Sequence, residues 1–267
     1  MRLHSYVEVS ALIRSLLSPY FAGEPELGIE LPGFSFDVVV SASLADGEPN
    51  PIEAVALINE AISHFVSSAL RSNTIPFVVA GDCLSALGCL GGLNQEGVHP
   101  NLLWIDAHGD FNTPETTPTG HLGGMPLAAI FGLGLQHLRE AMGFEPLSRE
   151  RIWLAGARDL DDDERIALDL SGIVRKNLLG QLIGLLPKDE PLWVHIDSDY
   201  IDPKYAPAMR YRSNGGPRPA GLARELAEVV QRCRVVGASL SAWAPHLDIE
   251  GKTAAACTTA IAPVLKM

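Results

Sequence analysis

Two short apolar runs are each followed by acidic side chains two residues apart. This pattern constrains the fold and the chemistry of the chain more than any other sequence feature. Residues 102–105 and 192–196 have the length of buried strands. The side chains that follow are Asp106, His108 and Asp110 after the first run, and Asp197 and Asp199 after the second. Because strand side chains alternate between two faces, we expect residues two apart to point the same way. Neighbouring strands of this kind would gather carboxylates that are costly to bury unpaired, so the pattern predicts a site for one or two divalent cations.

Predicted strands and helices alternate along the chain, which is typical of an α/β fold with a parallel sheet. The predicted strands are residues 36–43, 76–80, 102–106, 151–155, 191–196 and 234–240. The predicted helices are residues 51–71, 84–91, 125–133, a second helical segment that ends at 142, 165–170, 176–186, 219–232 and 251–264. We expect one three-layer αβα domain over residues 1–267 with a mostly parallel sheet. Ligands of such sheets bind beyond the carboxyl ends of the strands, where the acids lie.

Composition excludes several classes of protein. A net charge of −12 argues against a nucleic-acid partner, which needs a basic surface. We expect neither a signal peptide nor a membrane-spanning segment, because the first residues lack the signal pattern and no apolar run is long enough. The four cysteines form no CxxC pair. A reduced, cytoplasmic protein is therefore expected.

Four segments resemble, in the same order, signature segments of the arginase (ureohydrolase) superfamily. They are residues 80–88 (AGDCLSALG), 106–114 (DAHGDFNTP), 156–161 (GARDLD) and 197–203 (DSDYIDP). Four ordered matches are far more specific than one. The resemblance implies an arginase-like α/β fold and a metal-dependent hydrolase. Such an enzyme would cleave a linear C–N bond of a guanidino, N-hydroxyguanidino or related amino-acid-like compound.

The resemblance also implies a two-manganese centre in each subunit. Asp106 and Asp197 would bridge the two ions, Asp110 would complete one ion, and His108 and Asp199 would complete the other. A ligand set dominated by oxygen favours a hard ion such as Mn²⁺. In the family a hydroxide between the ions is the nucleophile, and Asp110 would accept a hydrogen bond from it and pass on a proton.

Further positions carry substrate contacts over from the family. Asn112, Thr117 and Thr119 correspond to positions that meet the α-carboxylate of an amino-acid substrate. Asp161 corresponds to a position that meets the α-amino group, although its acidic run is equally typical of a helix N-terminus. The expected partner is a small molecule. By analogy with relatives, the chain is expected to form homotrimers or homohexamers.

Three departures from the family pattern affect the metal and proton-transfer groups. Cys83 stands where the family usually has a histidine ligand, so the thiol either binds metal or lies beside it. The histidine that shuttles protons in the family is replaced by Gly123. His121, two residues earlier, is the candidate catalytic base in its place, unless it is an ordinary loop residue.

The guanidinium-binding half of the site is also altered. The late acid of the family falls on Ala242, and the expected hydroxyl is replaced around Tyr211, between Arg210 and Arg212. A site that lacks an acid and gains arginines suits a cationic guanidinium poorly. The less basic N-hydroxyguanidine fits better, and Cys83 and Gly123 are similar to the Nω-hydroxy-L-arginine hydrolase branch.

Two alternatives remain open. The first is a degraded ureohydrolase homologue that binds metal weakly and has a non-catalytic interaction role. The second is a zinc-dependent deacetylase-type amide hydrolase. Enzymes of that type pair one zinc ion with histidines as acid and base, and no His-His pair occurs in this chain.

Overall fold

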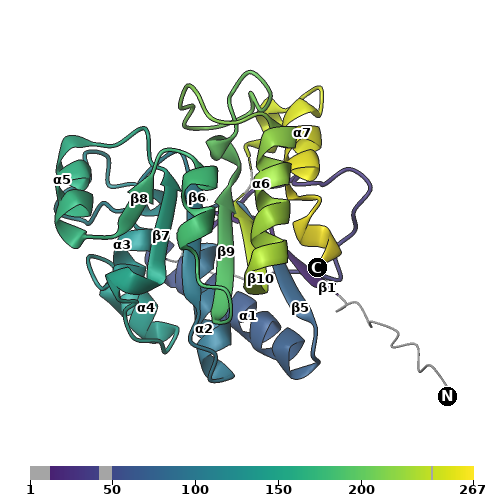
Figure 1. The fold of residues 1–267 in the computed structure, drawn as a ribbon. Coiled ribbons are helices and arrows are strands. Elements are labelled where there is room, and N and C mark those ends of the chain that lie inside the picture. The colour runs from purple at the N-terminus through teal and green to yellow at the C-terminus, as the bar shows by residue number, and fades with distance from the viewer. Residues whose placement is uncertain (1–12, 42–49, 242) are drawn as a thin grey trace, which may run out of the picture.

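The computed structural model describes residues 13–41, 50–241 and 243–267, and its centre is an eight-stranded parallel sheet (Figure 1). The strand order is β4-β1-β5-β10-β9-β6-β7-β8. These strands are β1 (Ile13–Ser18), β4 (Val38–Val39), β5 (Ile75–Ala80), β6 (Asn101–Asp106), β7 (Ile152–Gly156), β8 (Val174–Lys176), β9 (Pro191–Asp197) and β10 (Arg234–Ser241). A separate two-stranded hairpin pairs β2 (Tyr20–Phe21) with β3 (Glu24–Pro25).

Helices cover both faces of the sheet, as Figure 1 shows. One core contains the apolar sides of α1 (Pro51–Arg71) and α2 (Ser85–Gln95), and the other contains those of α6 (Pro219–Arg232) and α7 (Lys252–Ile261). The shorter helices are α3 (Pro126–Phe131), α4 (Gln136–Ala141) and α5 (Asp162–Ser171). The expected three-layer α/β architecture with a parallel sheet is thus confirmed.

Strand β6 shows how the sequence pattern produces two cores. Leu102 and Trp104 face the core of α1 and α2, whereas Leu103 and Ile105 face the core of α6 and α7. All four side chains are fully buried, because a central strand of a parallel sheet is covered on both faces. The strand ends at Asp106, which places the first acid of the motif at the carboxyl edge of the sheet.

Some predicted elements differ from those observed. The predicted helix over 176–186 is wrong: this segment contains the end of β8 and two 3₁₀ turns, Leu179–Gln181 and Ile183–Leu185. Gly180 and Gly184 disfavour a continuous α-helix there. The strand expected over 36–43 is reduced to Val38–Val39, and residues 42 and 43 lie outside the described residues. Strand β1 was not predicted at all.

Among the described residues, no helix is both long and apolar enough to cross a lipid bilayer.

Candidate metal centre

The acids of the two motifs meet because β6 and β9 are neighbours, with Ile105 paired to Ile196. Each strand ends at its first aspartate, Asp106 or Asp197. We expected the motif residues two apart to point the same way along one strand. This expectation is wrong, because both strands end before His108 and Asp199. Instead, Oδ1 of each aspartate accepts a hydrogen bond from the backbone N–H two residues later, at 2.7 Å in both cases. These matching Asx turns end both strands.

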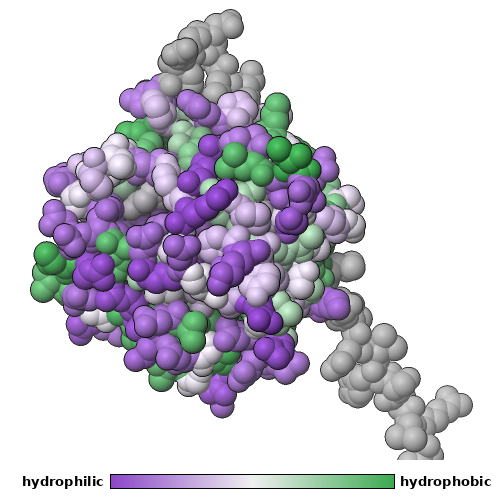
Figure 2. All heavy atoms as spheres, turned by 90° about the horizontal axis from the view of Figure 1, so that it is seen from above, coloured by the Kyte–Doolittle hydropathy of each residue, from purple (hydrophilic) through white to green (hydrophobic). Residues whose placement is uncertain are grey.

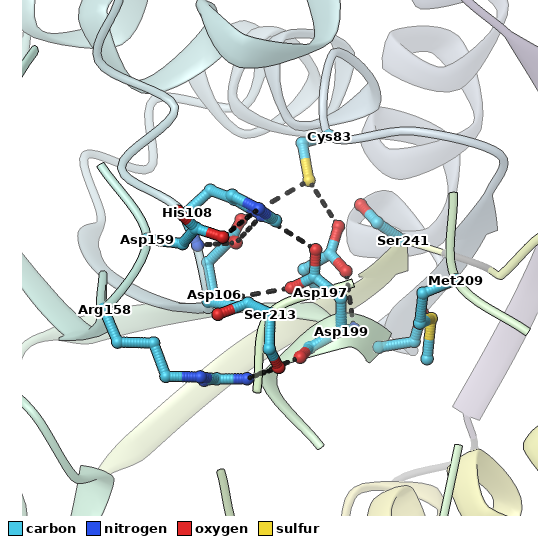
Figure 3. Close-up of polar contacts among 12 residues, drawn as sticks. Cys83, Asp106, His108, Arg158, Asp159, Asp197, Asp199, Met209, Ser213 and Ser241 are labelled. Carbon is cyan, nitrogen blue, oxygen red and sulfur yellow. Dashed lines mark hydrogen bonds and ion pairs between the residues drawn. The ribbon is translucent and has the colours of Figure 1, made fainter. Parts of the chain in front are cut away.

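His108 and Asp199, the residues that follow the two turns, contact each other directly (Figure 3). His108 Nδ1 lies 2.9 Å from Asp199 Oδ2 and 3.6 Å from Asp106 Oδ1. The second oxygen of Asp199 accepts a hydrogen bond from the backbone N–H of Ala107 at 3.1 Å. The loop after β6 is therefore tied to the turn after β9.

Cys83 enters the same cluster from a third strand. It lies just beyond the end of β5, and its side chain is buried. Its Sγ lies 3.0 Å from Asp197 Oδ2 and 3.8 Å from Asp106 Oδ2, and Figure 3 shows it above both carboxylates. The thiol thus faces the remaining oxygens of the two aspartates that the Asx turns leave free.

Asp110 completes the cluster from an unusual backbone conformation. Its φ is +49°, in the left-handed region that aspartate tolerates better than most residues. Its side chain is buried, and Oδ2 has no hydrogen-bond partner among the described residues. A buried carboxylate oxygen without a partner is costly, and a cation would satisfy it.

Two groups of donor atoms in this cluster are close enough to hold one ion each. Cys83, Asp106 and Asp110 form one group, and Asp106, His108 and Asp199 form the other; within each group the donor atoms lie within 4.8 Å of one another. Asp106 belongs to both groups. A shared carboxylate between two groups is the arrangement that a pair of bridged ions needs.

Burial and contacts among the side chains of this cluster shift their pKa values even without a metal ion. Burial raises the pKa of Asp110 and of Asp197 well above the ordinary value, and neighbouring aspartates raise it further. Burial would lower the pKa of His108, but Asp199 and Asp106 outweigh burial and raise it to about 12. A divalent cation would favour the ionised carboxylates and displace the proton of the imidazole. The donor set, with the unsatisfied oxygen of Asp110, fits two divalent cations.

The cluster forms the floor of a cavity of about 410 Å³. Its lining includes Asp110 and the expected substrate contacts Asn112, Thr117, Thr119 and Asp161, together with His121, the candidate base. Figure 2 views the molecule from the end where the loop after β9 lies, and most of that face is hydrophilic. Such a cavity has the size of a small-molecule site and suits a polar ligand.

Asp161 serves as a helix cap as well as a cavity residue. It is the N-cap of α5, and its backbone N–H donates to Glu164 Oε2 at 3.3 Å. Its Oδ2 accepts a hydrogen bond of 2.9 Å from the amide of Asn112. The Asn112 oxygen in turn accepts from Thr116 at 2.9 Å. Capping of α5 and a contact with substrate are therefore compatible roles for Asp161.

His121 fills the space that a side chain at position 123 would occupy. A Cβ placed on Gly123 would lie 2.4 Å from His121 Nε2. The imidazole stacks on Phe21 at a ring distance of 5.4 Å and lies 5.2 Å from the ring of Tyr211. Burial lowers the pKa of His121, which keeps the ring neutral at neutral pH. A neutral imidazole in this place can accept a proton.

The altered half of the site can be placed only in part. Ala242 lies outside the described residues. Trp243 is buried and lines the cavity, as do Arg210, Tyr211 and Arg212. Arg210 forms an ion pair with Glu26. Trp104, Trp153 and Trp193 are buried in the core, and so are the other three cysteines.

Three residues near the centre were not assigned a role from the sequence. Glu164 is buried and accepts a hydrogen bond of 2.9 Å from Phe111 N, beside Asp110. The D-x-x-E spacing of a capping box would have indicated it. Trp104 Nε1 donates to Asp106 Oδ2 at 3.2 Å. Arg158 Nη2 donates to the carbonyl of Asp199 at 2.9 Å, and no local pattern marks this contact.

Comparisons with known proteins agree with this geometry. Residues 22–266 match the model of the Arginase family. Arginase of Bacillus caldovelox is 30% identical over 224 residues, which cover 78% of this chain and 74% of that protein. N(omega)-hydroxy-L-arginine amidinohydrolase of Streptomyces lavendulae is 32% identical over 205 residues, which cover 76% and 71%.

Solved structures show the same fold. The structure of arginase from Bacillus caldovelox has a TM-score of 0.82 with 23% identity, over 96% of this chain and 99% of that one. Formimidoylglutamase of Bacillus subtilis has a TM-score of 0.73 with 14% identity, over 96% and 86%.

Proposed function

Because the chain belongs to the arginase family, we propose that it is a two-manganese hydrolase of a linear C–N bond in a guanidino-type amino-acid-like compound. The observation that carries this proposal is the pair of donor groups that share Asp106 at the floor of the cavity. Their donor atoms are mostly carboxylate oxygens, a set that favours a hard ion such as Mn²⁺. When bound, two such ions would lower the pKa of a shared water and make it a nucleophile at neutral pH.

The proposal assigns Asp106, Asp197, Asp110, His108 and Asp199 as ligands, with Cys83 beside Asp110 as the sixth. Asp106 and Asp197 would bridge, because each presents its Oδ2 toward the thiol of Cys83. Their Oδ1 atoms stay bound to backbone N–H groups, which fixes both carboxylates in place.

Proton transfer would use two groups of the chain. Asp110, which lines the cavity, would accept a hydrogen bond from the shared hydroxide and pass on a proton. His121 would exchange protons with the departing nitrogen, since its neutral ring replaces a side chain at Gly123. Both groups line the cavity, so both can reach a bound substrate.

The charges of the cavity favour an N-hydroxyguanidino substrate over a guanidino one. Arg212 lines the cavity and would repel a fully cationic guanidinium, whereas the charge of Arg210 is paired with Glu26. An N-hydroxyguanidine is less basic and is neutral in larger proportion. The relative named for hydroxy-L-arginine supports this preference. Asn112, Thr117, Thr119 and Asp161 would contact the amino-acid end of the substrate.

A cytoplasmic location and a homotrimeric or homohexameric assembly remain predictions. The four free, buried cysteines support a reducing compartment.

A substrate screen tests the proposed function. The Mn²⁺-loaded protein is incubated with arginine, Nω-hydroxy-arginine, agmatine, guanidinobutyrate and formimino-glutamate, and the release of urea, hydroxyurea and formamide is measured. We expect turnover of Nω-hydroxy-arginine to exceed that of arginine, and no turnover by Asp197→Ala. If none of the compounds reacts while Mn²⁺ is bound, the proposed function is wrong and a non-catalytic role is favoured.

A further inference from the structure

Two segments of the chain supply opposite charges to the cavity lining. Asp159 and Asp161 belong to the segment after β7, whereas Arg210 and Arg212 belong to the loop after β9. All four residues line the cavity. A ligand with one cationic and one anionic group at the same end would match both segments in charge.

The guanidinium of Arg210 already forms an ion pair within the protein. Its guanidinium pairs with Glu26, a carboxylate whose side chain is only 9% exposed. It also lies 4.3 Å from the ring centroid of Phe21. His246 Nδ1 lies 3.7 Å from the other oxygen of Glu26. Arg210 therefore ties the loop after β9 to the hairpin region of Phe21 and Glu26, and has little charge to offer a ligand.

Arg212 has no such partner. Among the described residues, nothing forms a hydrogen bond or an ion pair with its guanidinium. In the described part of the cavity wall, Arg210 and Arg212 are also the only lysine or arginine side chains. Arg212 is thus the available permanent cation of this site.

The backbone beside Arg212 is fixed to the metal centre. Arg158 Nη2 donates to the carbonyl of Ser213 at 3.2 Å and to the carbonyl of Asp199 at 2.9 Å. Arg158 Nε also donates to the carbonyl of Asn214 at 3.1 Å. Figure 3 shows this arginine reaching from one side of the centre to both segments. The exposed side chain of Arg212 therefore starts from a defined position, although its end is free.

Asn112 is less available for an anionic ligand than Arg212. Its side chain is 6% exposed, one amide N–H is donated to Asp161, and its oxygen accepts from Thr116. We propose that Arg212 binds the carboxylate of an amino-acid-like substrate and thereby sets the preference for substrates with a carboxylate at this end. The inference rests on the proposed function, since it names the group that selects the substrate class.

The test measures binding rather than turnover. The Mn²⁺-loaded protein is titrated by calorimetry with L-ornithine and with 1,4-diaminobutane, which differ only in the carboxylate. We expect the wild type to bind L-ornithine at least about tenfold more tightly, the contribution of one charge-assisted hydrogen bond. Arg212→Gln should remove this preference by weakening the binding of L-ornithine without weakening that of the diamine, and Arg212→Lys should keep part of the preference.

Arg218→Gln is the matched control. Arg218 lies in the same connection between β9 and α6, but its guanidinium packs 5.7 Å from the ring of Tyr205 and does not line the cavity. This variant should keep the wild-type preference. The inference is overturned if Arg212→Gln keeps the preference, or if the wild type binds both compounds equally or binds neither. Failure of the proposed function is a separate result, namely no hydrolysis of any screened compound.

Discussion

The thiol of Cys83 lies 3.0 Å from Oδ2 of Asp197 and is part of one of the two candidate metal-binding groups. A thiolate is a softer ligand than Mn²⁺ prefers, and burial with three nearby aspartates raises the pKa of this thiol well above its ordinary value. Both effects weaken Mn²⁺ binding at this group.

Cys83→His should therefore strengthen Mn²⁺ binding, because a neutral imidazole binds the ion without a costly deprotonation. We expect the weaker of the two dissociation constants to fall by roughly tenfold, measured by electron paramagnetic resonance titration. Cys233→Ser, which changes a thiol at the end of α6 outside the cavity, is the control. An unchanged affinity in Cys83→His would place the thiol out of reach of the metal.

Trp104→Phe should weaken metal binding without unfolding the protein. Trp104 Nε1 donates to Asp106 Oδ2 at 3.2 Å, and this contact orients the carboxylate that both groups share. Loss of a hydrogen bond to a metal ligand typically lowers affinity by about 10- to 100-fold.

Trp193→Phe provides the comparison for Trp104→Phe. Trp193 is equally buried, but its Nε1 donates to Ser239 Oγ at 3.0 Å rather than to a ligand. We expect this variant to retain the Mn²⁺ affinity of the wild type. Equal losses in both variants would show that core packing, rather than the hydrogen bond to Asp106, is responsible.

His121 should be required for proton transfer. His121→Asn is expected to lower kcat by about 100-fold, the usual contribution of a positioned acid–base group. Gly123→Ala should lower kcat as well, because the added Cβ would lie 2.4 Å from His121 Nε2 and displace the ring. His137→Asn changes a histidine of α4 that does not line the cavity, and should have full activity. Full kcat in His121→Asn would refute the assignment.

Glu164 should make the stability of the metal-free protein depend on pH. Burial raises the pKa of this carboxyl from 4.5 to about 7. The folded protein thus holds a proton that the unfolded chain loses, and the contribution of Glu164 to stability falls as pH rises from 4.5 to about 7. In Glu164→Gln this dependence is absent.

Urea unfolding of both proteins at pH 5 and pH 8, with the metal removed, measures this effect. The free energy of unfolding of the wild type relative to Glu164→Gln should be lower at pH 8 than at pH 5 by roughly 2 kcal/mol. A difference that is the same at both pH values would contradict the raised pKa.

The fold could be predicted where local patterns are strong. The predicted helix over 51–71 has the observed bounds of α1, because apolar spacing, the N-cap Asn50 and Pro51 all point to the same start. Strand β1 was missed because Arg14, Ser15 and Ser18 interrupt its apolar pattern. Its stability comes from pairing with β5, distant in sequence, and from the hydrogen bond of Ser15 to Asp37.

The residues of the candidate site could be predicted from the sequence more completely than their geometry. The sequence indicated that Asp106, Asp197 and their neighbours converge, and the structure brings them together. The route differs, because each aspartate ends its strand by bonding its own following backbone. A turn of this kind has the same spacing as strand alternation, so the two could not be separated by pattern alone. The contacts of Arg158 depend on loop packing and leave no local signal.

Metal content is the most direct test of the central claim that this acidic cluster is a two-metal centre. The wild type and Asp197→Ala are incubated with excess Mn²⁺, freed of unbound metal, and analysed by mass spectrometry, with Asp202→Ala as a control outside the cavity lining. We predict two Mn per chain in the wild type and in Asp202→Ala, and none in Asp197→Ala. One tightly held Zn, negligible Mn in the wild type, or two Mn retained by Asp197→Ala would contradict the account.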